Sequence, residues 1–227
     1  MGKYLKLFDT HTEYEMFTQT EDFIKPNVSH CIEENHIHYN PFIPPFFCKL
    51  TLNDDSVVEI EGSGELTNAM LQSYINTCVS AEIGDTCTSI GLNAFKNCSG
   101  LTSVTIGNST TSIGSNAFTN CQGLVAVDIP DSVTNIDTFA FYGCTNITNV
   151  IIGSGITNIG NSAFYGCSNL SLVTVKATTP PSLVNSAFSS TNINSGNIYV
   201  PSACVNTYKA ASGWSSYASR IQAIPTT

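Results

Sequence analysis

An internal repeat of 23 residues constrains the fold of this chain more than any other feature of its sequence. An Ala-Phe pair recurs four times at this spacing, with an Ile four residues before it and a Cys soon after it. A fixed period of this length predicts a solenoid, in which each unit buries its apolar face against its neighbours. The columns are Ile90, Ile113, Ile136 and Ile159; Ala94-Phe95, Ala117-Phe118, Ala140-Phe141 and Ala163-Phe164; and Cys98, Cys121, Cys144 and Cys167.

Each copy ends in a segment that is typical of a strand with one buried face, at 101–106, 124–129, 147–152 and 170–175. The positions of Leu101, Val104 and Ile106 are apolar in every copy, whereas the positions between them vary. Solenoids usually bind partners on their sheet face. Ile151 and Leu172 favour a contact site there, although scattered apolar surface residues are an alternative interpretation. The predicted binding face consists of Ser103, Thr105, Ala126, Asp128, Asn149, Ile151, Leu172 and Thr174.

Gly and Asn exchange at two positions around each Cys, which predicts backbone with positive φ. One position directly precedes the Cys, and the other follows it by two residues. Each unit is therefore expected to contain a short helical turn that ends near the Cys and a tight bend into the strand. The two columns are Asn97, Asn120, Gly143 and Gly166; and Gly100, Gly123, Asn146 and Asn169.

The copy "TSIGSNAFTNCQGLVAVDIPDSV" (111–133) resembles the BspA-like leucine-rich repeat, which is common in surface proteins of gut bacteria and their phages. The resemblance covers roughly residues 79–200, and the segment 198–224 is similar to the strand-plus-helix cap of such arrays. It implies a mainly β solenoid of four 23-residue coils with short helical turns. It also implies adhesion, protein–protein interaction or display rather than catalysis.

Charge is distributed unevenly along the 227 residues, which indicates a boundary near residue 65. Residues 1–65 hold twelve of the seventeen acidic residues, and residues 66–227 hold only nine charged residues in all. We therefore expect an α+β module over 1–65, the solenoid with an N-terminal helical cap over 66–200, and a C-terminal helical cap over 201–227. The acidic balance disfavours nucleic-acid binding, and the absence of a long apolar run predicts no membrane insertion.

Several elements are predicted outside the regular repeats. Residues 9–19 have the pattern of a short helix, 27–32 and 36–40 that of a β-hairpin, and 48–62 that of a second hairpin. Residues 66–77 are expected to form a helix with Leu66, Met70, Leu71 and Tyr74 on one side. Residues 79–84 align with 102–107 and are expected to form a degenerate first strand.

The nine cysteines are interpreted mainly as reduced, buried side chains. Cysteines that stack in one column present parallel Cβ vectors, a geometry that suits the packing of small hydrophobic groups better than bridging. The states of Cys31, Cys48, Cys78, Cys87 and Cys204 stay open.

The hairpin "PNVSHCIEENHIHYNP" (26–41) contains the one group of residues with metal-ligand chemistry. A turn centred on Glu34-Asn35 pairs Glu33 with His36 and Cys31 with His38, a set of types that holds zinc in other proteins. A polar solvent or subunit-contact face is the favoured alternative, so no metal or other cofactor is predicted. The sequence shows no catalytic motif, and no enzyme activity is expected.

The same hairpin resembles an N-terminal module of phage and prophage structural proteins of gut Bacteroidales, the crAss-like phages among them. The resemblance implies attachment or assembly through this end of the chain. Together with the missing export signal at the N-terminus, it favours a virion protein assembled in the host cytoplasm, of fibre or decoration type. Residues 1–65 are then expected to bind other virion proteins and to form a homo-oligomer, while the array contacts a host-surface glycan or protein. The alternative is a bacterial cell-surface adhesin.

Overall fold

The computed structural model describes residues 32–33, 36–37, 47–184 and 186–226. The chain divides into two compact units, residues 1–44 and 45–227. In the first unit, β1 (Ile32–Glu33) pairs with β2 (His36–Ile37) in antiparallel register, and Glu33 lies opposite His36 as expected. The helix expected over 9–19 lies outside the described residues.

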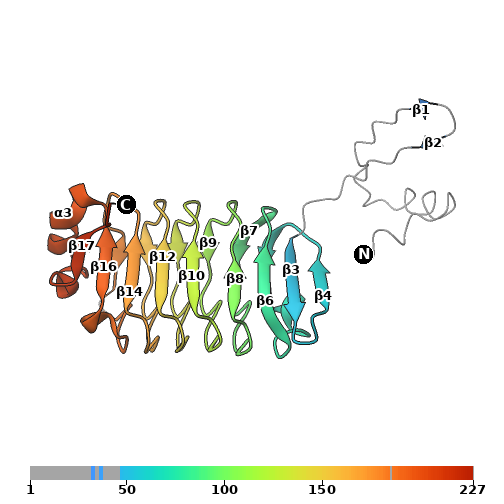
Figure 1. The fold of residues 1–227 in the computed structure, drawn as a ribbon, viewed down its shortest axis with the longest axis horizontal. Helices are drawn as coiled ribbons and strands as arrows, with labels where there is room; N and C mark the ends of the chain where they lie inside the picture. The colour runs from blue at the N-terminus through green and yellow to red at the C-terminus, as the bar shows by residue number, and fades with distance from the viewer. Residues whose placement is uncertain (1–31, 34–35, 38–46, 185, 227) are drawn as a thin grey trace. The chain divides into compact units, whose positions relative to one another are not determined.

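The second unit is an array of coils whose longest strands lie side by side on one face (Figure 1). Successive strands from β10 to β14 pair in parallel at an offset of one repeat, so Ala126 lies beside Asn149 and Asn149 beside Leu172. The fold is therefore mainly β, as predicted. The strands of this face are β6 (Cys78–Ile83), β8 (Ser103–Thr105), β10 (Ala126–Ile129), β12 (Asn149–Ile152), β14 (Leu172–Val175), β16 (Asn197–Val200) and β17 (Ile221–Ala223).

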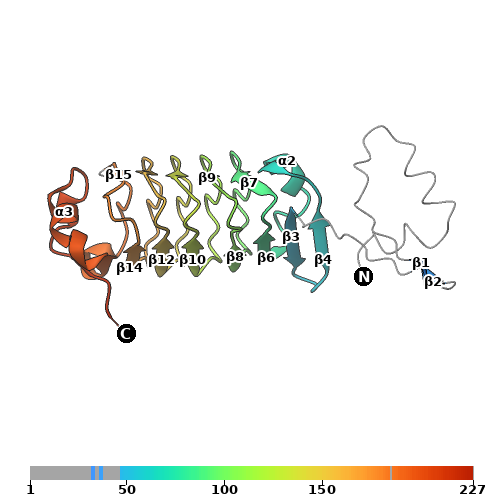
Figure 2. The same ribbon diagram turned by 90° about the horizontal axis from the view of Figure 1, so that it is seen from above.

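A second, six-stranded parallel sheet runs along the array across from the first face (Figure 2). Most of its strands are only two residues long, since the chain turns away after each Ile of the repeat. These strands are β5 (Gly64–Leu66), β7 (Cys87–Ile90), β9 (Ser112–Ile113), β11 (Asn135–Ile136), β13 (Asn158–Ile159) and β15 (Ser182–Leu183).

The phenylalanine column forms the centre of the core between the two sheets. Neighbouring rings stack with centroids 5.0–5.3 Å apart and planes within 12° of parallel, and every ring is buried. Offset stacking at this spacing is a favourable arrangement for aromatic rings. The column continues one coil beyond the four regular repeats, and its members are Phe95, Phe118, Phe141, Phe164 and Phe188.

The repeat cysteines form a second buried column and are free thiols, as predicted. Each of three thiols donates a hydrogen bond to the backbone carbonyl of the phenylalanine in the preceding coil. The Sγ–O distances are 3.1 Å from Cys121 to Phe95, 3.0 Å from Cys144 to Phe118, and 3.1 Å from Cys167 to Phe141. Cysteine therefore supplies both a small apolar group and a weak donor for a buried carbonyl.

The turn before each Cys has the positive φ that the sequence predicts. Asn97, Asn120, Gly143 and Gly166 have φ between 61° and 74°. The prediction for the second column is wrong, because none of Gly100, Gly123, Asn146 and Asn169 has positive φ. A Cβ at Gly123 would lie 2.8 Å from two backbone carbonyl oxygens of the preceding coil, so glycine there permits close approach.

A further positive-φ column directly precedes the Ala-Phe pairs and was not predicted. Its members have φ between 54° and 59°. Asn is common in this conformation, but Phe is an outlier there. The residues are Asn93, Asn116, Phe139 and Ser162.

The N-terminal end of the array is closed by the hairpin predicted over 48–62, formed by β3 (Cys48–Leu52) and β4 (Val57–Ile60). β3 pairs antiparallel with β6, which pairs in parallel with β8, as expected for a degenerate first strand. The hairpin therefore belongs to the sheet of the array, and the compact units divide after Pro44 rather than near residue 65.

Only part of the predicted helix 66–77 forms. The helix α2 spans Asn68–Leu71, and turns follow it. Leu66 and Leu71 are buried as expected, but Met70 is 38 % exposed. Leu66 instead ends β5, whose pairing with β7 fixes the start of the second sheet.

The C-terminal cap combines helical segments with the edge strand β17. The 3₁₀ helix η2 (Ile193–Ser195) precedes β16, and η3 (Ser202–Cys204), α3 (Val205–Ala210) and η4 (Ser215–Tyr217) follow it. Trp214 is fully buried, lies against Phe188 with ring centroids 6.4 Å apart, and donates to the Pro181 carbonyl at 2.8 Å. The cap therefore ends the aromatic column without exposing its last ring.

Candidate functional site

The candidate site is the sheet face, which we define as the outward side chains of β3, β4, β6, β8, β10, β12, β14, β16 and β17. Along β10 and β12 these outward positions alternate with fully buried ones. The structure places all eight predicted residues on this side: Ser103, Thr105, Ala126 and Asp128 are exposed, and Asn149, Ile151, Leu172 and Thr174 are half-buried. Their role in binding stays a prediction.

Parallel pairing arranges the outward side chains in two straight lines. Ala126, Asn149, Leu172 and Asn197 form one line, and Asp128, Ile151, Thr174, Tyr199 and Gln222 form the other. Because backbone pairing fixes the strand spacing at about 4.8 Å, the side chains of each line are held in a regular array.

Sequence reasoning missed Asn197, Tyr199 and Gln222, because the period changes there. Leu172 pairs with Asn197, which is 25 residues later instead of 23. The alternation of buried Ile198 and Val200 with outward Asn197 and Tyr199 is the signal that identifies this strand without the repeat spacing.

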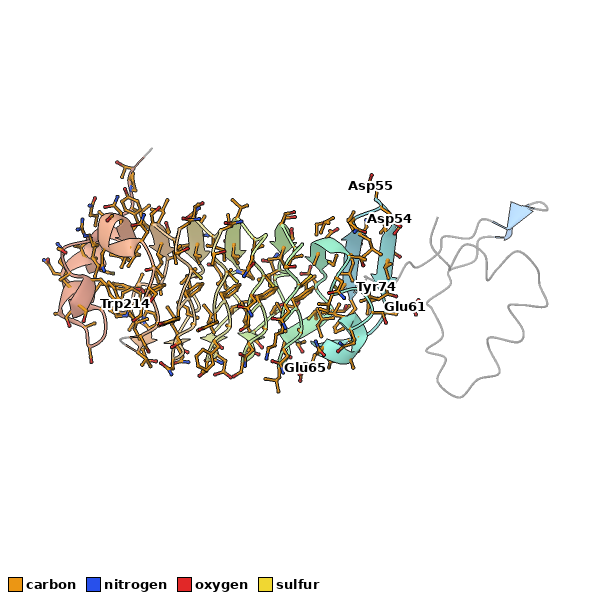
Figure 3. The ribbon with its side chains drawn as sticks, turned by 90° about the horizontal axis from the view of Figure 1, so that it is seen from below. Asp54, Asp55, Glu61, Glu65, Tyr74 and Trp214 are labelled. Atoms are coloured by element: carbon orange, nitrogen blue, oxygen red, sulfur yellow. The ribbon has the colours of Figure 1, made fainter. Side chains whose placement is uncertain are left out.

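The two parts of the sheet face differ in charge. No hydrogen-bonded pairing joins β8 to β10, so the face consists of a four-stranded and a five-stranded sheet. The four-stranded part carries Lys49, Glu59 and Glu82 in cross-strand register, and Asp54 and Asp55 lie at the tip of its hairpin (Figure 3). Asp128 is the one charged residue in the two lines of the five-stranded part.

An uncharged patch therefore lies on the C-terminal part of the sheet face. It consists of half-buried side chains, two of them aliphatic and one aromatic. Depletion of charge together with an aromatic residue is typical of the core of a protein interface. We define the uncharged patch as Asn149, Ile151, Leu172, Thr174, Asn197 and Tyr199.

One polar atom of this patch lacks a hydrogen-bond partner in the described structure. The Asn149 Oδ1 atom is buried between its line neighbours Ala126 and Leu172, whose side chains carry no donor. On the second sheet, by contrast, the equivalent amides bond one another, and Asn158 Nδ2 donates to Asn135 Oδ1 at 2.7 Å. An unsatisfied buried acceptor is costly, and because this atom is closed to solvent a docking partner does not reach it.

The less favoured zinc interpretation of the first hairpin stays untested. The antiparallel register brings Glu33 and His36 opposite each other along the backbone, while Cys31 and His38 lie outside the described residues. Within the ranges that the structure describes, no group of three His, Cys, Asp or Glu side chains is placed to hold a metal ion.

Two of the buried thiols, those of Cys48 and Cys121, are poorly suited to covalent chemistry. Burial, followed by the nearby Cys87 and Glu82, raises the pKa of the Cys48 thiol to about 12. Burial also raises the pKa of Cys121. Since the thiolate is the reactive form, these cysteines are protonated and inert near neutral pH.

The repeat geometry and the sequence columns define a leucine-rich-repeat solenoid, and a family comparison agrees. Residues 74–211, more than half of the chain, match the BspA type leucine-rich repeat region in six copies. The chain belongs to this family. Four coils were expected from the 23-residue columns, whereas the family profile recognises six copies. Among the described helices, none has the length and apolar character needed to cross a membrane.

Three solved structures illustrate the similarity. A leucine-rich repeat protein of T. pallidum is 31% identical over 40% of this chain and 45% of its own, with a TM-score of 0.39. A leucine-rich cell surface protein of Faecalibacterium prausnitzii is 29% identical over 64% of this chain and 44% of its own, with a TM-score of 0.47. A leucine-rich repeat protein of Bacteroides ovatus is 22% identical over 79% of this chain and 59% of its own, with a TM-score of 0.45.

This chain thus spans less than two thirds of each of the three proteins. No curated protein sequence matches the chain.

Proposed function

We propose that this chain is a non-enzymatic contact protein that binds a macromolecular partner through the uncharged patch of its sheet face. The observation that carries the proposal is the contrast between the interior and the outward columns. The interior columns of Ile90, Phe95 and Cys98 repeat the same residue in each regular coil. The outward line instead contains Asp128, Ile151, Thr174 and Tyr199. Packing constrains the interior columns and leaves the outward line free to serve recognition.

The patch has the properties of a protein contact. Ile151 and Leu172 provide apolar surface, and Tyr199 adds a large side chain with a polar end. Parallel pairing on a rigid sheet holds these groups in place before binding, which lowers the entropic cost of association.

The segment ahead of the array is proposed to attach the protein to its carrier and to drive homo-oligomer formation. The resemblance of residues 26–41 to a module of phage structural proteins supports a virion as the carrier. A bacterial cell surface is the competing carrier. Mass spectrometry of purified phage particles and of bacterial surface fractions separates the two, since absence of the protein from the particles contradicts the virion proposal.

Binding by the patch is tested with fluorescently labelled full-length protein on gut bacterial cells. We expect Leu172→Asp to reduce cell binding at least about tenfold, because the carboxylate is buried against a partner without a counter-charge. The matched control is Thr105→Asp on the four-stranded part, which we expect to bind like the wild type. Equal binding by Leu172→Asp and wild type contradicts the proposed role of the patch.

A further inference from the structure

Two buried cysteines at the N-terminal end of the array depart from the regular pattern and lie against each other. Cys78 is the first residue of β6, the strand that pairs with β3 of the terminal hairpin (Figure 1). Cys98 lies in the turn of the first regular coil, 20 residues later. Their side chains are 2 % and 0 % exposed, and both are free thiols in the structure.

The repeat explains why two thiols meet at this point. Cys78 lies 23 residues before Leu101, so it occupies a position that holds Leu or Ile in every regular coil. Cys98 has no phenylalanine in the preceding coil to bond, because the residue 23 positions before Phe95 is Gln72. Its Sγ atom donates instead to the Cys78 carbonyl, with an Sγ–O distance of 3.7 Å. A thiol thus replaces an aliphatic group beside the start of the cysteine column.

The two thiols are close enough to hydrogen-bond each other. In the fully protonated pair, Cys78 Sγ donates to the Ser80 carbonyl at 3.4 Å. When Cys98 loses its proton, the Cys78 thiol donates to it, which lowers the pKa of Cys98 below its ordinary value and raises the pKa of Cys78. Because the thiolate is the nucleophile in disulfide chemistry, Cys98 is the member of the pair that attacks first.

Neighbours within the cysteine column are also close, but their geometry differs. Cys144 and Cys167 are near enough to hydrogen-bond, yet they are equivalent residues of successive coils, so their Cβ vectors are parallel. Cys78 and Cys98 belong to different columns, one at the start of a strand and the other in a turn. Since both side chains are buried and their sulfur atoms meet, their Cβ vectors converge, as a disulfide requires.

We propose that Cys78 and Cys98 form a disulfide when the protein meets a small-molecule disulfide, such as oxidised glutathione, outside a reducing compartment. The Cys98 thiolate attacks one sulfur of oxidised glutathione, forms a mixed disulfide and releases one glutathione thiolate. Cys78 then loses its proton, attacks the Cys98 sulfur of the mixed disulfide and releases the second glutathione. Two protein thiols are oxidised, one glutathione disulfide is reduced, and the two protons pass to the released glutathione thiolates.

The disulfide joins β6, which carries the terminal hairpin, to the first regular coil. A cross-link between residues 20 positions apart stabilises the fold by restricting the unfolded chain. The end of a repeat array has a neighbour on one side only and opens most easily, which gives glutathione access to the buried thiols. The inference does not depend on the proposed binding role of the uncharged patch.

The test refolds the reduced full-length protein from urea in a buffer of reduced and oxidised glutathione, where pairs that the fold brings together persist. Free thiols are then blocked with N-ethylmaleimide in denaturant, and linked peptides are identified by mass spectrometry. Cleavage before Asp85 and after Lys96 places Cys78, Cys87 and Cys98 on three separate peptides. We expect the first and third of these peptides to be joined, and fragmentation of the joined pair identifies the bonded residues.

The redox dependence of stability separates the disulfide from a packing role. We expect the oxidised wild type to melt at least about 5 °C above the same protein in a strong reductant. Cys98→Ala and Cys78→Val are each expected to melt at one temperature in both conditions. Cys144→Ala is the matched control, since it removes a buried thiol that is not part of the pair, and it is expected to keep the full difference.

The peptide map uses only the wild type, so it decides the question even where a variant fails to fold. The proposal is overturned if Cys78 and Cys98 are both recovered as blocked thiols, or if either is joined to another cysteine such as Cys48. It is also overturned if the oxidised and reduced wild type melt at the same temperature.

Discussion

The regular coils between Ile90 and Cys167 and the two ends of the array bury similar side chains by different means. In the regular coils, each phenylalanine stacks on the equivalent ring of the next coil, and each cysteine bonds a carbonyl of the coil before it. At the C-terminal end, Phe188 instead lies against Trp214, with planes inclined at 54°, and against Tyr217 at 88°.

The N-terminal end of the array is closed by an antiparallel hairpin instead. β4 forms the edge of the sheet, and its Glu59 is exposed. A short edge strand with charged residues resists pairing with another chain. The comparison shows that repetition stabilises the middle, whereas the ends need residues that stop the repeat.

Removal of the C-terminal cap is expected to have the largest effect. A chain that ends at Val200 loses the buried Tyr208, Trp214 and Ile221 and exposes the last ring of the column. At roughly 2–3 kcal/mol for each large apolar side chain, we expect the free energy of unfolding to fall by more than about 5 kcal/mol. Urea unfolding followed by circular dichroism measures the loss. Removal of residues 225–227 is the control. Wild-type stability of the chain that ends at Val200 would show that the array needs no cap.

Loss of one ring from the middle of the column ranks second. Phe118→Ala is expected to lower the free energy of unfolding by about 3–5 kcal/mol, because neighbouring rings on both sides hold the cavity open. Thr105→Ala, on the exposed face, is expected to cost less than about 0.5 kcal/mol. Chemical denaturation compares the two variants, and similar losses would contradict the assignment of inside and outside.

Alkaline pH is expected to weaken the N-terminal end through Cys48. Its pKa is about 12 when folded, against about 8.5 in an unfolded chain, so the unfolded state loses its proton first as pH rises. The stability that the protonated Cys48 thiol contributes is fully present below about pH 8. It declines between about pH 9 and 12, by up to about 1.4 kcal/mol per pH unit. For Cys48→Val, we expect the free energy of unfolding, measured by chemical denaturation, to fall less steeply between about pH 9 and 11. An unchanged slope would mean that Cys48 ionises equally in both states.

The smallest predicted effect concerns the turns of the middle coils. Asn120 has φ of 61° and donates to Asn97, so Asn120→Ala is expected to cost about 1–2 kcal/mol. Asn146→Ala, at a position without positive φ, is expected to cost under about 0.5 kcal/mol. Thermal unfolding measures both variants. An equal cost would mean that the two Gly/Asn columns have the same backbone requirement.

The sequence predicted the columns that repeat and failed where the repeat changes. Phe118 and Cys121 were assigned to the core because identical residues recur at one spacing, and the outward Asp128 was assigned because its column varies. Tyr199 was missed because a two-residue insertion shifts its strand. Phe139 was missed because a bulky residue replaces the asparagine that signals positive φ at Asn116.

The positions of α2 and of the hairpin depend on packing between segments that are distant in sequence. Asn68 contacts Asn93 only because α2 folds over the first coil. Charge composition placed the hairpin 48–62 with the N-terminal module, but its backbone pairs with β6. Hydrogen bonding between strands therefore determines where the hairpin lies, and charge composition does not.

The account rests on the 23-residue coil as the unit of stability, and deletion of one complete coil tests this most directly. Deletion of residues 118–140 joins Ala117 to Phe141 and keeps every column in register. We expect this variant to fold and to unfold cooperatively in urea, whereas deletion of residues 118–138 is expected to prevent cooperative unfolding. Cooperative unfolding of both variants with equal stability, or failure of the in-register variant to fold, would contradict the account.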